Sequence, residues 1–237
     1  MAKPAKFVNM KMDVLKEAEA ILFDFEGTLV DRQWNTEAAV QDTLQMLRGI
    51  GLPVDRLQGK TYRTLVKEAM AIATEAGCSP EDVREKIYAV YDRYDEDALS
   101  RWALRPEALE LLEALYTKEI KTGLVSNVGT RGLERALLKF CLHLLFEVVV
   151  SRNDVRNLKP SGEGLSLALN RLQVKRERAF FIGDSLEDIH AAREVGLKVM
   201  IILGGAPTSP ELLAANPDFL IQDFGEILNY FGEESVT

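Results

Sequence analysis

The 237-residue sequence is poor in the residues that build many metal and covalent sites, with two cysteines and two histidines. Cys78 and Cys141 belong to no CxxC pair, so neither a disulfide framework nor a cysteine zinc site is expected. Because His143 and His190 are the only histidines, neither a histidine metal site nor a histidine-based catalytic triad is expected. These absences favour a reduced, cytoplasmic protein.

Long apolar runs are also missing. No stretch approaches the roughly 18 residues needed to cross a bilayer, and the segment MAKPAKFVNMKMD lacks the apolar region and cleavage site of a secretory signal. The net charge of −8, from 29 basic and 37 acidic residues, would repel a nucleic-acid backbone. We therefore expect neither a nucleic-acid partner nor membrane association, and we expect a monomer or a homodimer.

What the sequence does contain is enough apolar material for a sizeable core, since hydrophobic residues make up 47% of the chain. Residues 20–25 (AILFDF) form a short apolar run typical of a strand buried on both faces. Helical periods alone follow to about residue 99, and strands and helices alternate from about residue 104. This pattern predicts an α/β fold, a doubly wound parallel sheet of Rossmann-like type with a helical insertion. The expected boundaries are 1–30 and 104–237 for the core and 31–103 for the insertion.

Polar residues follow the first predicted strand where a doubly wound sheet binds its ligands, beyond the carboxyl ends of the strands. Asp24 and Glu26 are two residues apart in an extended segment, so their side chains share a face. One carboxylate can attack phosphorus as a nucleophile, and its neighbour can move the proton of the leaving group. The alternative interpretation is a solvated turn with an acid that caps a helix.

Three further strand ends carry weaker signals of the same kind. Ser126 and Asn127 can hold phosphate oxygens at the start of a helix, or form an ordinary turn or cap. Lys159 can neutralise a phosphoryl group, or simply be a solvated lysine before a helix. Asp184 and Asp188 offer the hard oxygen ligands that suit Mg²⁺, although Asp188 also fits as the N-cap of the following helix.

Together these segments resemble the four motifs of the haloacid dehalogenase (HAD) superfamily in their order and spacing. The motifs are DFEGT at 24–28, Ser126-Asn127, Lys159-Pro160 and GDSLEDIHAAREVG at 183–196. The insertion at 31–103 is similar to the family's C1-type cap, as found in phosphoglycolate phosphatases and β-phosphoglucomutases. The resemblance implies a Mg²⁺-dependent phosphatase that acts on a small phosphorylated metabolite.

The resemblance also implies a role for each matching residue. Asp24 would be the nucleophile that forms an aspartyl-phosphate, Lys159 would balance its charge, and Glu26 would be the general acid and base. Mg²⁺ would be held by Asp24, by the backbone carbonyl of Glu26, by Asp184 and by Asp188. The expected phosphate-binding residues are Ser126, Asn127 and Thr28, the last of which supports the turn of the first motif.

Glu26 departs from the family pattern, which has a second aspartate at this position. The extra methylene moves the carboxylate outward by roughly a bond length, and a misplacement of that size can cost on the order of a hundredfold in rate. Glu26 can still be the acid and base, can support only slow turnover, or can mark a binding or regulatory protein that has left catalysis. A phosphosugar mutase is a further alternative. Arg32, on the linker into the insertion, is compatible with an anionic substrate contact or with plain solvation.

Overall fold

A computed structural model describes residues 13–205 and 210–233 of the chain, so most of the segment tested for a secretory signal lies outside the described residues. Its centre is a six-stranded, wholly parallel sheet with the strand order β3-β2-β1-β4-β5-β6. The strands are β1 (Ala20–Phe23), β2 (Lys121–Val125), β3 (Val148–Val150), β4 (Ala179–Gly183), β5 (Lys198–Ile202) and β6 (Phe219–Ile221). The predicted doubly wound fold is confirmed.

Strand β1 lies in the middle of the sheet, and its side chains alternate between the two faces, as the pleat of a strand requires. On one face a Cβ at Gly123 of β2 would lie 2.5 Å from Leu22 and 3.4 Å from Leu172 of α7 (Glu163–Leu172). On the other face Phe23 packs edge-to-face against Phe224, with ring centroids 6.4 Å apart. Both faces of the strand are therefore buried, which explains its uninterrupted apolar sequence.

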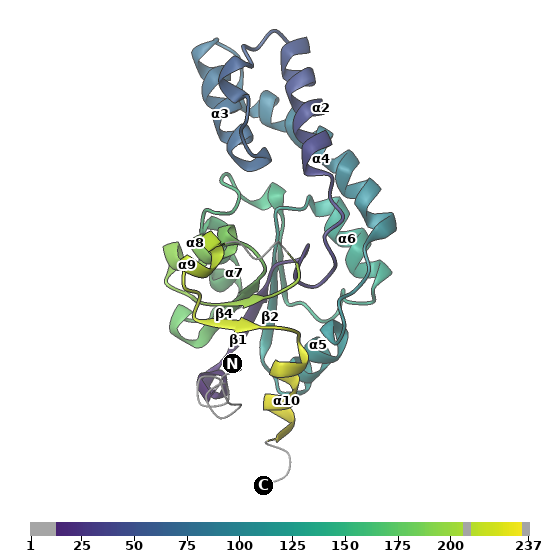
Figure 1. Ribbon diagram of the computed structural model, residues 1–237, viewed down its shortest axis with the longest axis vertical. Helices are drawn as coiled ribbons and strands as arrows, with labels where there is room; N and C mark the ends of the chain where they lie inside the picture. Colours follow the sequence, from purple (N-terminus) through teal and green to yellow (C-terminus); the bar gives the residue numbers. More distant parts are fainter. Residues whose placement is uncertain (1–12, 206–209, 234–237) are drawn as a thin grey trace. The chain divides into compact units, whose positions relative to one another are not determined.

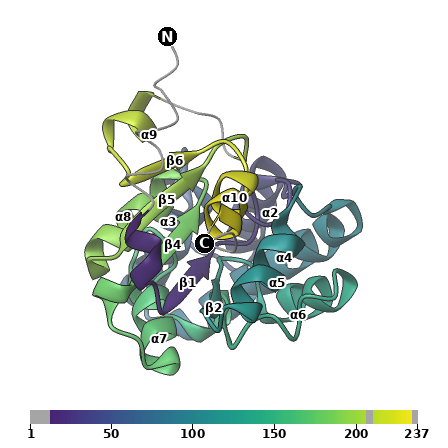
Figure 2. The same ribbon diagram turned by 90° about the horizontal axis from the view of Figure 1, so that it is seen from below.

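Helices cover both faces of this sheet (Figures 1 and 2). Helices α7 and α8 (Leu186–Val195) lie together on one side, and α5 (Ala108–Thr117) and α10 (Gly225–Glu233) lie together on the other. Helix α9 (Pro210–Ala214) and the short helices η1 (Asp13–Glu17), η3 (Arg152–Asp154) and η4 (Arg176–Arg178) complete this part of the chain. None of the described helices is both long and apolar enough to span a membrane.

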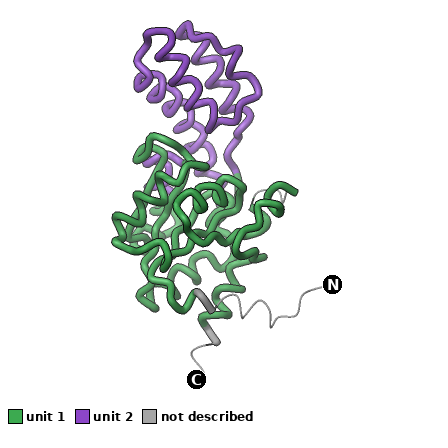
Figure 3. The backbone as a smooth tube through the Cα atoms, turned by 90° about the vertical axis from the view of Figure 1, so that its left-hand side faces the viewer, with its two compact units in different colours: residues 1–32, 103–127, 137–237 green, residues 33–102, 128–136 purple. Residues whose placement is uncertain are grey.

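The chain divides into two compact units, drawn in different colours in Figure 3. Unit 1 comprises residues 1–32, 103–127 and 137–237, and unit 2 comprises residues 33–102 and 128–136. Unit 2 is built from α2 (Thr36–Gly49), η2 (Asp55–Leu57), α3 (Tyr62–Glu75), α4 (Pro80–Arg101) and most of α6 (Thr130–Lys139). Ser79 caps α4 by accepting a hydrogen bond from the backbone N–H of Asp82, as its sequence predicts.

Unit 2 includes residues 128–136, which the sequence-based boundaries leave in the core. The buried carboxylate of Asp95 in α4 accepts a hydrogen bond of 2.9 Å from the backbone N–H of Gly129. Arg135 of α6 forms an ion pair with Glu96 of α4, and a Cβ at Gly132 would lie 3.1 Å from the Cβ of Asp95. These contacts attach the first turns of α6 to α4.

Within unit 1, the segments that lead into and out of residues 33–102 run side by side. Val30 and Leu104 form an antiparallel bridge. The Asp31 N–H donates to the carbonyl of Ala103 at 3.1 Å, and the Arg105 N–H donates to the carbonyl of Leu29 at 2.9 Å. Residues 29–31 and 103–105 are therefore held as a short two-stranded ribbon.

Candidate active site

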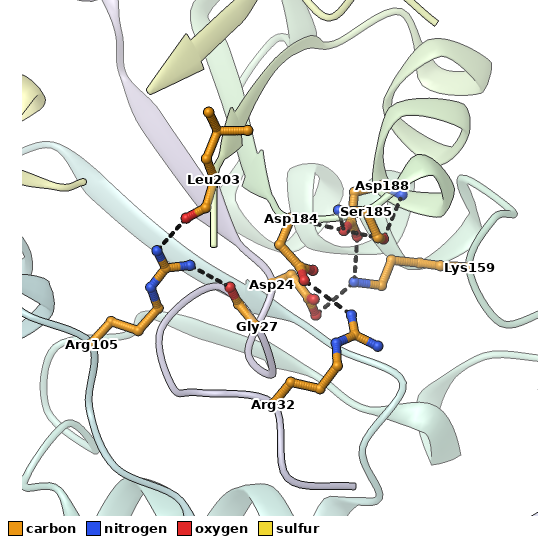
Figure 4. Close-up of polar contacts among 9 residues, drawn as sticks. All are labelled: Asp24, Gly27, Arg32, Arg105, Lys159, Asp184, Ser185, Asp188 and Leu203. Atoms are coloured by element: carbon orange, nitrogen blue, oxygen red, sulfur yellow. Dashed lines mark hydrogen bonds and ion pairs between the residues drawn. The ribbon is translucent and has the colours of Figure 1, made fainter. Parts of the chain in front are cut away.

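The ends of β1 and β4 bring two of the predicted acidic residues together (Figure 4). Asp24 directly follows β1, and Asp184 directly follows β4, the neighbouring strand in the sheet. Asp188 lies in the first turn of α8, and Lys159 lies between β3 and α7. Asp24, Asp184 and Asp188 each offer one carboxylate oxygen, and these three atoms lie within 4.8 Å of one another.

Lys159 joins two of these carboxylates. Its Nζ lies 2.6 Å from Oδ1 of Asp24 and 2.8 Å from Oδ1 of Asp188, and the lysine side chain is only 6% exposed. Burial disfavours the ammonium charge, but Asp188 and Asp24 outweigh burial and raise the pKa of Lys159 above its usual range. Lys159 is therefore a permanent cation that bridges the two acids.

Asp24 keeps its proton more tightly than an ordinary aspartate does. Burial raises its pKa, Lys159 opposes this, and the charge of Asp188 adds to the increase. The net shift is upward although a lysine lies in contact, because the cost of burying the charged carboxylate is the largest of these effects. Further positive charge beside Asp24 would favour its ionised form.

Asp188 is held by a dense set of hydrogen bonds. Its Oδ2 accepts from the backbone N–H of Asp184 at 3.2 Å, and from the N–H and hydroxyl of Ser185 at 3.0 and 2.6 Å. The N-cap of α8 is Ser185, and Asp188 is the third residue of the helix, where it completes a capping box with Ser185. The prediction that Asp188 is the N-cap is therefore wrong by three residues. A Cβ at Gly183 would lie 2.5 Å from the carboxyl carbon of Asp188, so only glycine fits there without a shift.

Asp184 has a strongly raised pKa. Burial and the charge of Asp188 raise its pKa to about 7, while Arg32 opposes the shift. Nη2 of Arg32 lies 3.0 Å from Oδ2 of Asp184. Oδ1 of Asp184 is buried and has no hydrogen-bond partner among the described residues. A buried carboxylate oxygen without a donor is costly unless another positive group approaches it.

The residues of this site fit a divalent cation such as Mg²⁺. Three carboxylates face the charges of Lys159 and Arg32, which leaves the group negative. Their oxygens are hard ligands of the kind that Mg²⁺ prefers, and Oδ1 of Asp184 is a buried acceptor still open to a cation. The carboxylate of Glu26 is not part of this group of three described acids.

The predicted phosphate-binding residues lie at the same edge of the sheet with different surroundings. Ser126 directly follows β2, is buried, and donates its N–H to the carbonyl of Val150 at 2.9 Å. Asn127 uses its carboxamide on Lys159: Oδ1 accepts from the Lys159 N–H at 3.0 Å, and Nδ2 donates to the Lys159 carbonyl at 3.3 Å. Asn127 therefore holds the lysine backbone in place.

Thr28 and Glu26 belong to the turn after β1. The carbonyl of Phe25 accepts hydrogen bonds from the N–H groups of Thr28, Leu29 and Val30. The Thr28 hydroxyl is fully buried and has no hydrogen-bond partner among the described residues. Glu26 is partly exposed and contributes to the positive shift in the pKa of Arg32.

Three arginines lie at this edge of the sheet. The sequence offers Arg32 as a candidate anion contact without indicating its acidic partner, and it carries no signal for Arg105 or Arg152. Arg32 contacts Asp184, and Arg105 donates to the carbonyls of Gly27 and Leu203. Arg152 is fully buried and donates to the Asn127 carbonyl at 3.0 Å. Single arginines in linkers and loops carry no spacing signal, so only the three-dimensional arrangement shows these contacts.

Comparison with known proteins identifies the family. The model of the haloacid dehalogenase-like hydrolases matches residues 21–202, and the chain belongs to this family. Phosphoglycolate phosphatase of Salmonella typhimurium is 28% identical over 93% of this chain and 95% of its own length. Phosphoglycolate phosphatase of Photorhabdus laumondii is 26% identical over 96% of this chain and 98% of its own length.

Solved structures give the same result for the fold. A hydrolase from Pseudomonas syringae is 25% identical, with a TM-score of 0.66 over 91% of this chain and 98% of its own. CbbY from Rhodobacter sphaeroides, solved in complex with phosphate, is 26% identical, with a TM-score of 0.63 over 91% of this chain and 99% of its own. The observed sheet and flanking helices are therefore those of the family.

Proposed function

We propose that this chain is a Mg²⁺-dependent phosphatase that hydrolyses a small phosphate monoester through an aspartyl-phosphate on Asp24. The observation that carries the proposal is the contact of 2.6 Å between Lys159 Nζ and Asp24 Oδ1 inside a buried group of three carboxylates. Family membership and the phosphoglycolate phosphatase relatives support a phosphoric-monoester substrate. Phosphoglycolate is accordingly the first substrate to test.

Lys159 and Asp24 would carry the first chemical step. Lys159 fixes one oxygen of Asp24, and the other oxygen attacks phosphorus as the bond to the leaving oxygen breaks. Glu26 gives its proton to the leaving oxygen, and the ionised Glu26 then takes a proton from the water that hydrolyses the acyl-phosphate. Ser126 and the neighbouring backbone N–H groups would hold the phosphoryl oxygens during both steps.

Asp24, Asp184 and Asp188 would hold the Mg²⁺ ion, together with the backbone carbonyl of Glu26. When bound, the ion supplies charge neutralisation for the phosphoryl group and the nucleophile. Asp188 has one oxygen on Lys159 and the other on three donors, so its main task would be to hold Lys159 and the start of α8 around the ion. We further propose that residues 31–103 are a cap that contributes substrate specificity.

A trapping experiment tests the chemistry directly. The wild-type protein with Mg²⁺ and an aryl phosphate should turn over, and Asp24→Asn should abolish turnover. Acid quenching should leave phosphate covalently bound to a peptide that contains residue 24, in a form released by hydroxylamine. Thr117→Ala, on the exposed end of α5, is the matched control and should behave as wild type.

The weak-enzyme and binding alternatives derive from one observation, the glutamate at position 26. A stable phospho-enzyme with slow release of phosphate would indicate that Glu26 serves the second step poorly. No labelling and no turnover across a panel of phosphorylated metabolites, with ligand binding retained, would instead indicate a binding protein. Transfer of phosphate between positions of a phosphosugar would indicate a mutase.

A further inference from the structure

We infer that Arg105 is a positioning residue for Asp184, because it joins two glycine turns that enclose the Asp184 carboxylate. The inference rests on the proposed function in one respect, that Asp184 is a ligand of the divalent cation. Arg105 lies on the ribbon where the chain returns from residues 33–102, and it belongs to none of the four sequence motifs.

The guanidinium of Arg105 links the ends of two strands. Nη1 donates to the carbonyl of Gly27 at 2.7 Å, in the turn after β1. Nη2 donates to the carbonyl of Leu203, directly after β5. Figure 4 shows the two bonds leaving from the two terminal nitrogens of the guanidinium, one toward Gly27 and the other toward Leu203. The backbone of Arg105 is itself fixed, since its N–H donates to the Leu29 carbonyl at 2.9 Å.

Asp184 has no spare room between the two joined turns. A Cβ at Gly27 would lie 2.1 Å from Oδ2 of Asp184, far inside contact distance. A Cβ at Gly205 would lie 2.0 Å from the Gly27 carbonyl oxygen and 2.6 Å from Oδ2 of Asp184. The two glycines and the carboxylate therefore pack directly on one another, and a displacement of either turn would move the carboxylate.

The choice of arginine follows from this geometry. A planar guanidinium can donate to two carbonyls at fixed directions, whereas an ammonium is a single point donor. The contacts that Arg105 makes among the described residues are carbonyls, with no carboxylate in ion-pair contact. Burial lowers the pKa of Arg105, and the charges of Asp184 and Asp223 only oppose this from a distance. The side chain therefore acts as a brace between backbone segments.

Mg²⁺ binding in the absence of substrate tests the inference. Isothermal titration calorimetry and the Mg²⁺-induced rise in melting temperature should show about 10- to 100-fold weaker affinity for Arg105→Met, the usual effect of losing an outer-shell partner of a metal ligand. The Mg²⁺ affinity of Arg105→Lys should lie between those of the wild type and Arg105→Met. Arg178→Met removes an arginine of the same unit that pairs with Glu19 on the surface, and it should bind Mg²⁺ as wild type does.

Chemical rescue separates positioning from general loss of structure. Arg105→Ala should regain Mg²⁺ affinity in millimolar guanidinium ion but not in the same concentration of urea. In turnover assays, the Mg²⁺ concentration for half-maximal rate should rise more than the saturating rate falls.

The outcomes are distinct. Wild-type Mg²⁺ affinity in a folded Arg105→Met protein would overturn the inference and leave the proposed phosphatase intact. If Arg105→Met does not fold, Arg105→Lys decides: wild-type affinity overturns the inference, and affinity weakened by several fold supports it. A wild-type protein that binds no Mg²⁺ would overturn both the inference and the proposed metal dependence.

Discussion

Arg32 is the cation that faces Asp184, with Nη2 3.0 Å from Oδ2, while Lys159 faces the other two acids of the site. The two cations therefore divide the three carboxylates between them. Arg32 is the more exposed of the pair, with 36% of its side chain accessible, and this ion pair is the only hydrogen-bonded or ionic contact of its guanidinium among the described residues. The remaining N–H donors are open to an anion.

Arg32→Gln should destabilise the protein only where Asp184 is ionised. In metal-free buffer at pH 8 we expect a loss of about 1 kcal/mol, a small value because the arginine is partly exposed, and a melting temperature lower by about 2–4 °C. At pH 5 the loss should vanish, since the pKa of Asp184 is about 7 and the carboxyl is then neutral. Thermal unfolding at both pH values measures this. A loss of equal size at pH 5 would contradict it, and Arg178→Gln is the control.

Mg²⁺ affinity should depend on pH through Asp184. The folded metal-free protein holds the Asp184 proton with a pKa of about 7, against 3.8 for an ordinary aspartate, so Mg²⁺ must displace a proton below pH 7. We expect affinity to fall up to about tenfold per unit of pH below 7. Calorimetry in two buffers of different ionisation enthalpy should show proton release at pH 6 and little at pH 8. Affinity that is constant over this range would contradict the expectation that Mg²⁺ displaces a proton from Asp184.

Lys159→Met should cost more stability than any surface lysine does. It leaves Asp24 and Asp188 buried without their common cation, and the loss of one partner of a buried pair costs about 3–5 kcal/mol. The cost should shrink as the pH falls, because the raised pKa of Asp24 lets that carboxyl take up a proton. Urea unfolding measures both effects. Lys198→Met, at the exposed start of β5, is the matched control, and an equal loss in both variants would refute the expectation.

Glu26→Gln should slow the hydrolysis of poor leaving groups most. A general acid contributes about 10²- to 10⁴-fold in rate when the departing oxygen needs a proton. We therefore expect at least about a hundredfold loss of kcat/KM on alkyl phosphates and a much smaller loss of kcat/KM on nitrophenyl phosphate, whose leaving group departs without a proton. The comparison uses kcat/KM because this ratio reports the first step alone, before the shared hydrolysis of the acyl-phosphate. Equal losses on both substrates would point to a role of Glu26 in the turn rather than in proton transfer. Glu37→Gln, at an exposed position in the first turn of α2, serves as control.

The fold could be predicted from the sequence because the apolar runs, the alternation of strands and helices and the capping residues all indicate the same arrangement. Residues 20–23 are apolar on both faces because helices cover both faces of β1, and the alternation after residue 104 gives the parallel order. Ser79-Pro80 marks the start of α4 because capping is a local interaction. The grouping of 128–136 with the helical unit involves contacts to Asp95 and Glu96, two acidic residues among several in α4, and no local pattern distinguishes them.

The candidate site also contains residues that the sequence predicts and residues that it does not. Residues at the carboxyl ends of strands could be predicted, since topology alone brings Asp24 and Asp184 to one edge of the sheet. The partner of the Asn127 carboxamide could not, because a carboxamide can equally face a phosphate or the backbone of Lys159. Arg105 is less accessible still, since its two acceptors are carbonyls, which every residue possesses.

The hydrogen bond from Gly129 to Asp95 limits how the helical part of this chain can be exchanged with that of a relative. A chimaera that replaces only residues 33–102 would contain α4 from the relative and the start of α6 from this chain. The two residues that form this hydrogen bond, 95 and 129, would then come from different parents. Recombination experiments in this family would then succeed more often when the segment around residue 129 travels with the insertion. The segment to exchange would be the whole of unit 2, residues 33–102 together with 128–136, and not residues 33–102 alone.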